Sequence, residues 1–343
     1  MKHLFCSVKT LSAFFFFAVS FTVFSQDIRY KSYTGNKPVS EKTLFSFGVG
    51  FAPKIQIGTG VEYVFQDYDY VLSKLVWPLL PSAGFQAYAE LYSKSGFHAV
   101  FTASFSLQHM TGKTADYDFT NNADKKMLTK FSLHHCMLEY GRQYCFSAGW
   151  IMPLIEYFRS GEKIKIYAEP CIGVRYYAHM WTAADGYLQY SGSDTESVFP
   201  DTPKINFKGK AAQYTQTLIL PNIGILFKFD LPKKWNIKTA VQLCPQTVGL
   251  CEDIHFGRDI IFYDIFNRKG FSFHLDFFAE KKLNTVLSAF FSIDCGTAVS
   301  YNGMTFVRST LTKRIISIAH EEASGTALYT ADLSLGFLLR FGR

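Results

Sequence analysis

Apolar and polar side chains alternate along most of this chain with a period of two residues. From Phe97 to Leu107 the odd positions are apolar and the even positions are mostly polar. The same alternation recurs in residues 164–176, 271–277 and 332–341. Successive side chains of a β-strand point to opposite faces of the sheet, so each segment predicts a strand with one apolar and one mixed face.

A soluble β-sandwich would alternate in the same way, but three features favour a membrane barrel. The alternating segments reach about the ~9–11 residues that a tilted strand needs to cross a bilayer. Their mixed faces carry small residues and isolated charges, which suit the lumen of a barrel. Short connections also alternate with long ones: the short ones are expected near 93–95, 158–162, 231–234 and 281–282, and the long ones at 66–71, 111–128, 185–212, 252–259 and 300–325.

The fold class that follows is all-β. We expect a single ten-stranded antiparallel transmembrane β-barrel of the outer-membrane type, with both termini at the end that carries the short turns. Only a closed sheet satisfies every backbone hydrogen-bonding group inside a lipid bilayer.

The first 25 residues read as a secretion signal. Lys2 and Lys9 form a basic region, residues 11–24 form an apolar core, and Ser25 ends a small-residue cleavage site. A transmembrane anchor is the alternative, but the apolar run is shorter than the ~20 residues of a spanning helix. We expect residues 1–25 to be the signal peptide and residues 26–343 to form a barrel in the cell outer membrane.

Composition supports a membrane barrel and argues against nucleic acid as a partner. The chain is 48% hydrophobic and 17% aromatic, as the aromatic girdles of a barrel require. Removal of Lys2 and Lys9 leaves 33 basic against 28 acidic residues, a scattered net charge of +5. The six cysteines that remain match neither a zinc knuckle nor a disulfide scaffold, so mostly free thiols and no metal are expected.

Two short acidic motifs fall in the long connections. Asp116 and Asp118 lie within TADYDF, and Asp253 and His255 lie within CEDIHF. In an extended segment residues i and i+2 share a face, so each motif forms a pair. A carboxylate beside an imidazole orients it and raises its basicity, and two close carboxylates tend to share a proton. Taken alone, these motifs are weak, and a solvated acidic loop or a calcium site explains them more often than catalysis does.

Six segments resemble, in the same order, the omptins, a family of outer-membrane endopeptidases built on a ten-stranded barrel. The resemblance covers most of the chain after residue 25. It implies an aspartyl-type (omptin) endopeptidase that acts on polypeptide substrates, with its active site in the long loops on the extracellular side. The segments are GVEYVF (60–65), TADYDF (114–119), LTKFSLH (128–134), GVRYYAHMWTAADGYLQYS (173–191), GKAAQYTQTLILPNIGI (209–225) and EDIHF (252–256).

The resemblance also implies roles for individual residues. Asp116, Asp118, Asp253 and His255 match the catalytic quartet. In that quartet a water is held between Asp116 and His255, and the imidazole takes a proton from the water. Asp253 orients the imidazole, and Asp118 hydrogen-bonds Asp116 and adjusts its charge. Glu62 matches an acid at the floor of the S1 pocket, which selects a basic P1 residue before the scissile bond. The alternation in residues 45–61 independently predicts that Glu62 faces inward. The odd positions there are apolar and face the lipid, so the even positions face the lumen.

Three departures from the family pattern change these expectations. Cys251 stands where the family has a second S1 acid, so the preference for a basic P1 residue should be relaxed. Lys130 replaces an acid near the prime side and should disfavour basic P2′ residues. The basic residues that bind lipopolysaccharide in enterobacterial members fall on Ala178 and Thr217. No cofactor is therefore expected, outer-membrane lipids are the other expected partners, and a requirement for a membrane lipid stays open.

The main alternative is a catalytically silent outer-membrane barrel that acts as an adhesin or structural protein. A diffusion porin is a weaker one, because ten strands leave a lumen filled largely by side chains. The quartet is complete although Phe119 and Phe256 replace the Trp and Tyr of the family, which favours the protease. Ser132 and His134 lack an oxyanion motif and are expected to line the wall.

Overall fold

The computed structural model describes residues 45–342, apart from 67–69, 123–124, 160–161, 193–196, 199–201 and 268–269. The expected signal peptide, residues 1–25, lies outside this described part. The regular elements in it are all β-strands. None of its residues belongs to a helix that is long and apolar enough to cross a membrane.

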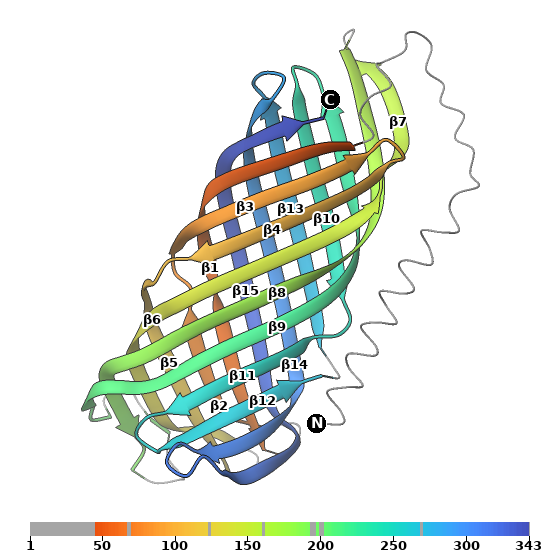
Figure 1. Ribbon diagram of the computed structural model, residues 1–343. Coiled ribbons are helices and arrows are strands. Elements are labelled where there is room, and N and C mark those ends of the chain that lie inside the picture. The colour runs from red at the N-terminus through yellow and green to blue at the C-terminus, as the bar shows by residue number, and fades with distance from the viewer. Residues whose placement is uncertain are drawn as a thin grey trace. The chain divides into compact units, whose positions relative to one another are not determined.

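Fifteen strand segments run antiparallel to their neighbours (Figure 1). They are β1 (Phe45–Gln66), β2 (Tyr70–Pro78), β3 (Ser82–Ser93), β4 (Phe97–Ser106), β5 (His109–Asn122), β6 (Lys125–Trp150), β7 (Met152–Arg159), β8 (Glu162–Tyr190), β9 (Ile205–Leu231), β10 (Trp235–Cys244), β11 (Val248–His255), β12 (Ile260–Phe266), β13 (Phe271–Lys282), β14 (Leu287–Ser309) and β15 (Ile315–Phe341).

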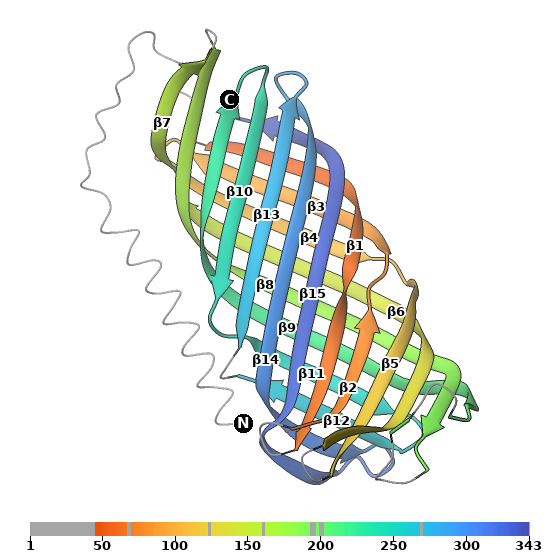
Figure 2. The ribbon, with the colours of Figure 1, turned by 180° about the vertical axis from the view of Figure 1, so that it is seen from behind.

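These segments make ten wall strands. Five of the wall strands are each interrupted once, so that β2 continues into β3, β4 into β5, β6 into β7, β10 into β11 and β12 into β13. The first strand pairs with the last, from Phe47 opposite Phe341 to Val64 opposite Ser324, and this pairing closes the sheet. The view from behind shows the closed wall (Figure 2). The predicted ten-stranded antiparallel barrel is confirmed.

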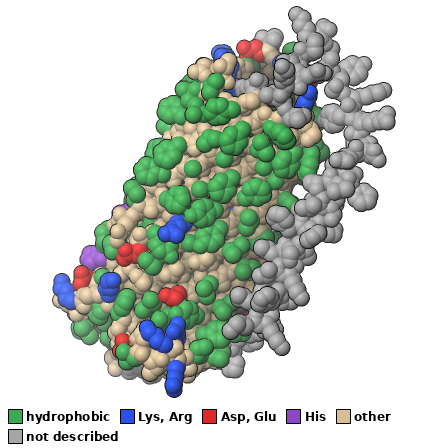
Figure 3. Space-filling view, viewed as in Figure 1, with side chains coloured by type: hydrophobic (Ala, Val, Ile, Leu, Met, Phe, Trp, Pro, Cys, Tyr) green, Lys and Arg blue, Asp and Glu red, His purple; other side chains and the backbone are tan. Residues whose placement is uncertain are grey.

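The wall turns its apolar side chains outward and its polar side chains inward, as the alternation predicts. Leu335 is 65% exposed, whereas Ser334 beside it is 2% exposed. Phe273 likewise faces out and His274 faces the lumen. Apolar side chains cover most of the visible wall (Figure 3). An apolar outer band of this kind is what a barrel needs to sit in lipid.

The predicted loop boundaries are wrong in several places. The sequence predicts loops at 111–128, 185–212 and 300–325, but most of these residues continue as the paired strands β5–β6, β8–β9 and β14–β15. Likewise β2 begins at Tyr70 and β11 runs to His255. The reason is that polar strands beyond the lipid still satisfy their backbone groups by pairing with each other. The turn expected at 281–282 lies at 283–286, because β13 extends to Lys282.

Charged side chains fill the lumen at the level of the apolar band. Lys238 lies 2.6 Å from Glu90, and Lys54 lies 2.9 Å from Asp332. Arg175 on β8 reaches across to β13 and β14 and pairs with the register partners Asp276 and Asp294. Pairing of this kind offsets the cost of burying charges. The lumen here is packed with side chains, as expected for ten strands.

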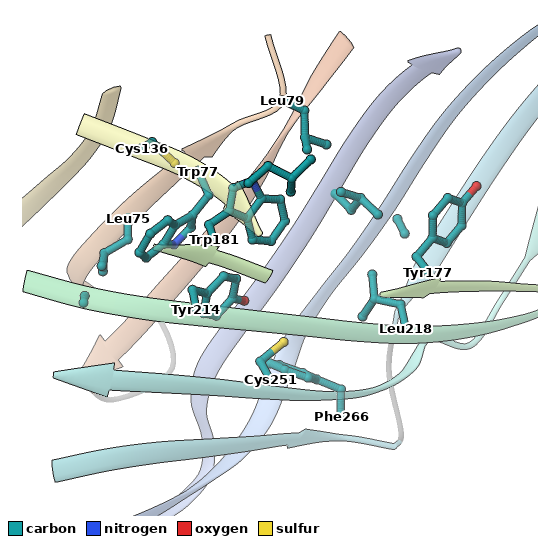
Figure 4. Packing of buried hydrophobic residues seen from close by; sticks show 14 of the residues in the cluster. Leu75, Trp77, Leu79, Cys136, Tyr177, Trp181, Tyr214, Leu218, Cys251 and Phe266 are labelled. Carbon is teal, nitrogen blue, oxygen red and sulfur yellow. The ribbon is translucent and has the colours of Figure 1, made fainter. Parts of the chain in front are cut away.

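An aromatic layer separates this charged interior from the rim. The rings of Trp77 and Tyr214 stack with centroids 5.4 Å apart, and Trp181 stacks on Tyr214 at 6.0 Å (Figure 4). Gly60 makes room for this layer, because a Cβ there would lie 2.9 Å from the Trp181 ring. The side chains of the rim lie directly beyond this aromatic layer, which forms the bottom of the space that they surround.

Candidate active site

The rim beyond the aromatic layer is a ring of ten strands. In order they are β1, β2, β5, β6, β8, β9, β11, β12, β14 and β15. Asp116 and Asp118 lie on β5, and Asp253 and His255 lie on β11. These two strands are four places apart in the ring, so they face each other across its lumen. Outward-facing charges, Arg142 and Glu252, mark the end of the apolar band on this side.

Asp253 and His255 form a hydrogen-bonded pair on β11. The Nε2 of His255 is bonded to Oδ2 of Asp253, whose side chain is almost fully buried. Burial alone would lower the pKa of His255, but the charge and the hydrogen bond of Asp253 outweigh it and raise that pKa. The carboxylate therefore orients the imidazole and makes it a stronger base, as the sequence predicts for residues i and i+2 of a strand.

Asp116 and Asp118 form the second pair, and Lys130 lies against both. Burial and the charge of Asp118 raise the pKa of Asp116 to about 6, although Lys130 and His255 act to lower it. The Nζ of Lys130 lies 2.8 Å from Asp118 Oδ2 and 3.8 Å from Asp116 Oδ2. Ser73 on β2 donates a hydrogen bond of 3.2 Å to Asp116. Lys130 was placed near the prime side by its sequence position, and the structure puts its ammonium on the carboxylate pair.

The two pairs act on each other across the lumen. The charge of His255 lowers the pKa of Asp116, and the charge of Asp116 raises the pKa of His255. Such a mutual effect requires the two groups to be close. A carboxylate and a basic imidazole on opposite sides of a gap can hold a water and remove its proton.

Glu62 faces the same lumen from β1. Its side chain is 2% exposed, and burial raises its pKa well above 4.5, with further contributions from Asp253, Asp264 and Asp116. Its Oε2 is buried without a hydrogen-bond partner. The inward orientation predicted from the parity of β1 is confirmed. A buried acid with one carboxyl oxygen unsatisfied is a candidate for binding a cation.

Cys251 also points inward, as its sequence position predicts. It is fully buried, and its thiol lies 3.7 Å from the Thr326 hydroxyl. A re-aimed strand after Pro245 could have brought Glu252 inward instead. The wall is indeed interrupted at residues 245–247, but β11 resumes with Cys251 facing the lumen and Glu252 facing out.

Ser132 and His134 line the wall, as expected. Ser132 is buried opposite Asp116 in the β5–β6 pair, and a ring nitrogen of His134 is bonded to the carbonyl oxygen of Asp185. His135 points to the opposite face and is exposed. The described side chains contain no group of three or more His, Cys, Asp or Glu placed to hold a metal ion. All six cysteines in the described ranges are free thiols.

One acid at the rim was missed by reasoning from the sequence. Asp264 on β12 is 3% exposed and is the register partner of Cys251. It stands inside the apolar run IIFYDIF. A single acid within an apolar run is the sequence signal that could have identified Asp264. Burying a charged group costs free energy, so such a residue usually has a structural or functional role.

Comparison with known proteins identifies the fold. A model of the Omptin family matches residues 46–337. The crystal structure of the outer membrane protease OmpT from Escherichia coli is similar with a TM-score of 0.73 and 13% identity, covering 86% of this chain and 97% of that one. A toluene transporter from Ralstonia pickettii, TbuX, covers 87% of this chain and 90% of its own with 9% identity, but its TM-score of 0.24 supports no inference. No curated protein matches the chain.

The family match spans nearly all of the described barrel, and the structural match covers 86% of the chain. At 13% identity the structural match establishes only the fold, whereas the family model matches the sequence itself. Together with the ten-stranded closed wall, these matches show that the chain belongs to the omptin family.

Proposed function

We propose that this protein is an outer-membrane endopeptidase that cleaves peptide bonds with a water activated by two side-chain pairs. The observation that carries the proposal is the position of Asp116 on β5 and His255 on β11, which face each other and shift each other's pKa. Membership of the omptin family and the likeness to an outer membrane protease support it. The rim then faces the outside of the cell, where polypeptide substrates are met.

In this mechanism the water lies between Asp116 and His255. His255 takes one proton as the water oxygen attacks the carbonyl carbon of the peptide, and the imidazolium then gives that proton to the leaving amine. Asp253 stabilises the imidazolium through its hydrogen bond. Asp116 accepts a hydrogen bond from the other hydrogen of the water, which stays on the attacking oxygen, and the neighbouring Asp118 raises the pKa of Asp116.

The S1 pocket of the proposed enzyme is formed around Glu62. A buried carboxyl oxygen without a partner gains a charge-assisted hydrogen bond when an Arg or Lys side chain enters. We therefore propose a preference for basic P1 residues. Cys251 lines the same space but supplies no charge.

One observation favours the alternative of a silent barrel. The ammonium of Lys130 lies on the Asp116–Asp118 pair and offsets part of its negative charge. A protein that had lost its activity could keep such a contact as a structural ion pair. Activity measurements on the protein itself decide between the two proposals.

The deciding experiment is digestion of a peptide library by the purified barrel in detergent, with cleavage sites read by mass spectrometry. The protease proposal expects cleavage that Asp116→Ala abolishes. Asp259→Asn is the matched control, because Asp259 is an exposed acid at the tip of the β11–β12 hairpin. Folding of each variant is checked by the difference in gel mobility between heated and unheated barrel. If the wild type cleaves nothing, the silent barrel is the better proposal. If Asp116→Ala cleaves as well as the wild type, the mechanism through Asp116 is wrong.

A further inference from the structure

Asp264 is a buried acid that the proposed mechanism does not use. Its carboxyl accepts a hydrogen bond of 2.5 Å from the Thr305 hydroxyl on β14. Two residues further along β12, on the same face, Phe266 is fully buried in the floor of the rim. No Lys or Arg among the described residues is ion-paired with Asp264 or with Glu62. Acids that are buried without a cation are costly, and such residues are commonly functional.

Asp264 and Glu62 belong to one pocket although they come from distant strands. Asp264 is paired in register with Cys251, and Cys251 contacts Thr326 across the lumen at 3.7 Å. Thr326 is in turn the register partner of Glu62. The charge of Asp264 also raises the pKa of Glu62. Along the ring, Asp264 on β12 is three places from Glu62 on β1, with Thr326 on β15 next to Glu62 and Cys251 on the far side of Asp264.

A second observation shows that this pocket is ready for a ligand. Oε2 of Glu62 is buried and has no hydrogen-bond partner. Burial raises the pKa of Asp264 to about 7. The hydroxyls of Thr305 and Ser324 act to lower this pKa but do not offset the burial, and the charge of Asp253 adds to the rise. A cation placed between the two acids would relieve both defects, because it supplies hydrogen-bond donors and compensating charge.

We propose that Asp264 is the second acid of the S1 pocket, supplied from β12 in place of the acid that Cys251 lacks, and that Asp264 and Glu62 together bind the guanidinium or ammonium group of a basic P1 residue. The inference rests on the proposed endopeptidase function for its biological meaning. It changes one expectation, because the pocket keeps two acids and the preference for basic P1 residues is not relaxed by Cys251.

The test measures cation binding directly and needs no catalysis. Benzamidine serves as the guanidinium-like probe, and its binding to the intact barrel in detergent at pH 8 is followed by calorimetry. Asp264→Asn is expected to weaken benzamidine binding about tenfold, the effect of losing one charged contact. Asp259→Asn is the matched control on the same hairpin and should bind as the wild type does. Uncharged benzamide should bind weakly to every variant.

A second variant keeps the inference falsifiable if Asp264→Asn fails to fold. Cys251→Asp places a new carboxylate beside Asp264, where repulsion between like charges favours one shared proton. We expect it to tighten benzamidine binding less than twofold. A gain of tenfold would show that the pocket lacked a second acid, and would overturn the inference.

The outcomes separate this inference from the proposed function. Unchanged benzamidine binding in Asp264→Asn, or no binding by the wild type, overturns the role of Asp264 even if peptides are cleaved. Binding that depends on Asp264, in a barrel that cleaves no peptide, supports the pocket and contradicts the endopeptidase. Cleavage after Arg that Asp264→Asn weakens, with cleavage after apolar residues unchanged, supports both.

Discussion

The ammonium group of Lys130 lies 2.8 Å from a carboxylate oxygen of Asp118 and 3.8 Å from one of Asp116. Lys130 and Asp118 are register partners in the β5–β6 pair, so the contact is made directly across two neighbouring strands. A cation thus lies against the carboxylate pair of the proposed mechanism. Its effect is to lower the pKa of Asp116, against the burial and the charge of Asp118 that raise it to about 6.

Removal of this cation should shift the pH dependence of cleavage. The proposed mechanism needs Asp116 ionised, as the stronger acceptor for the water, and His255 neutral, as the base, so the rate falls as the pH drops through the pKa values of both groups. Lys130→Met raises the pKa of Asp116 further, and the acid limb of the kcat/KM profile should move to higher pH. Lys113→Met, an exposed lysine on the same hairpin, is the control and should leave the profile in place. Superimposable profiles for wild type and Lys130→Met would contradict this role.

His255→Ala should remove most of the activity and leave the barrel folded. Loss of a general base costs about 10²–10⁴-fold in rate. His255 lies at the rim end of β11, outside the apolar band, so the heat-dependent gel shift of the folded barrel should persist. A variant that keeps more than about a tenth of the wild-type rate would rule out His255 as the base.

Glu62→Gln should nearly abolish the preference for Arg over Ala at P1. The substitution keeps the size of the side chain and removes its charge, which is the feature that a basic P1 residue requires. Paired peptides that differ only at P1 give the ratio of kcat/KM values. Equal ratios for wild type and Glu62→Gln would show that Glu62 does not form the pocket.

Glu62→Gln should also stabilise the folded barrel relative to the wild type at high pH. The pKa of Glu62 is raised in the folded state above its usual 4.5, so its protonated form favours folding. That contribution is present at low pH and is lost as the pH rises from 4.5 through the raised folded pKa. Glu62→Gln avoids the loss, so its advantage in melting temperature over the wild type should be larger at pH 8 than at pH 4. A difference that does not depend on pH would contradict this linkage.

Cleavage should not require lipopolysaccharide. Ala178 and Thr217 are register partners in the β8–β9 pair, so the two positions that carry basic residues in enterobacterial omptins lie side by side here without charge. Rates measured on barrel refolded in detergent, with and without added lipopolysaccharide, should agree within about twofold, since no charged contact is available to either side chain. Strict dependence on the lipid would show that other residues bind it.

The sequence alone determined the face of each wall residue. Alternation places Phe273 outward and His274 inward because the side chains of a strand point to opposite faces, and this holds in any sheet. The same rule paired Asp253 with His255 and turned Glu62 into the lumen. These are local relationships, two residues or fewer apart along the chain, and local sequence contains all the information that they need.

Tertiary structure decided which wall strands meet across the lumen. The position of β5 opposite β11 depends on closure of the ring between β1 and β15, which no local pattern encodes. Asp264 comes to lie beside Cys251 because β12 pairs with β11 in one register, and a shift of one residue would turn its carboxyl outward. The rim strands read as loops in the sequence because polar strands lack the alternation that lipid imposes, and only pairing with their neighbours shows them to be strands.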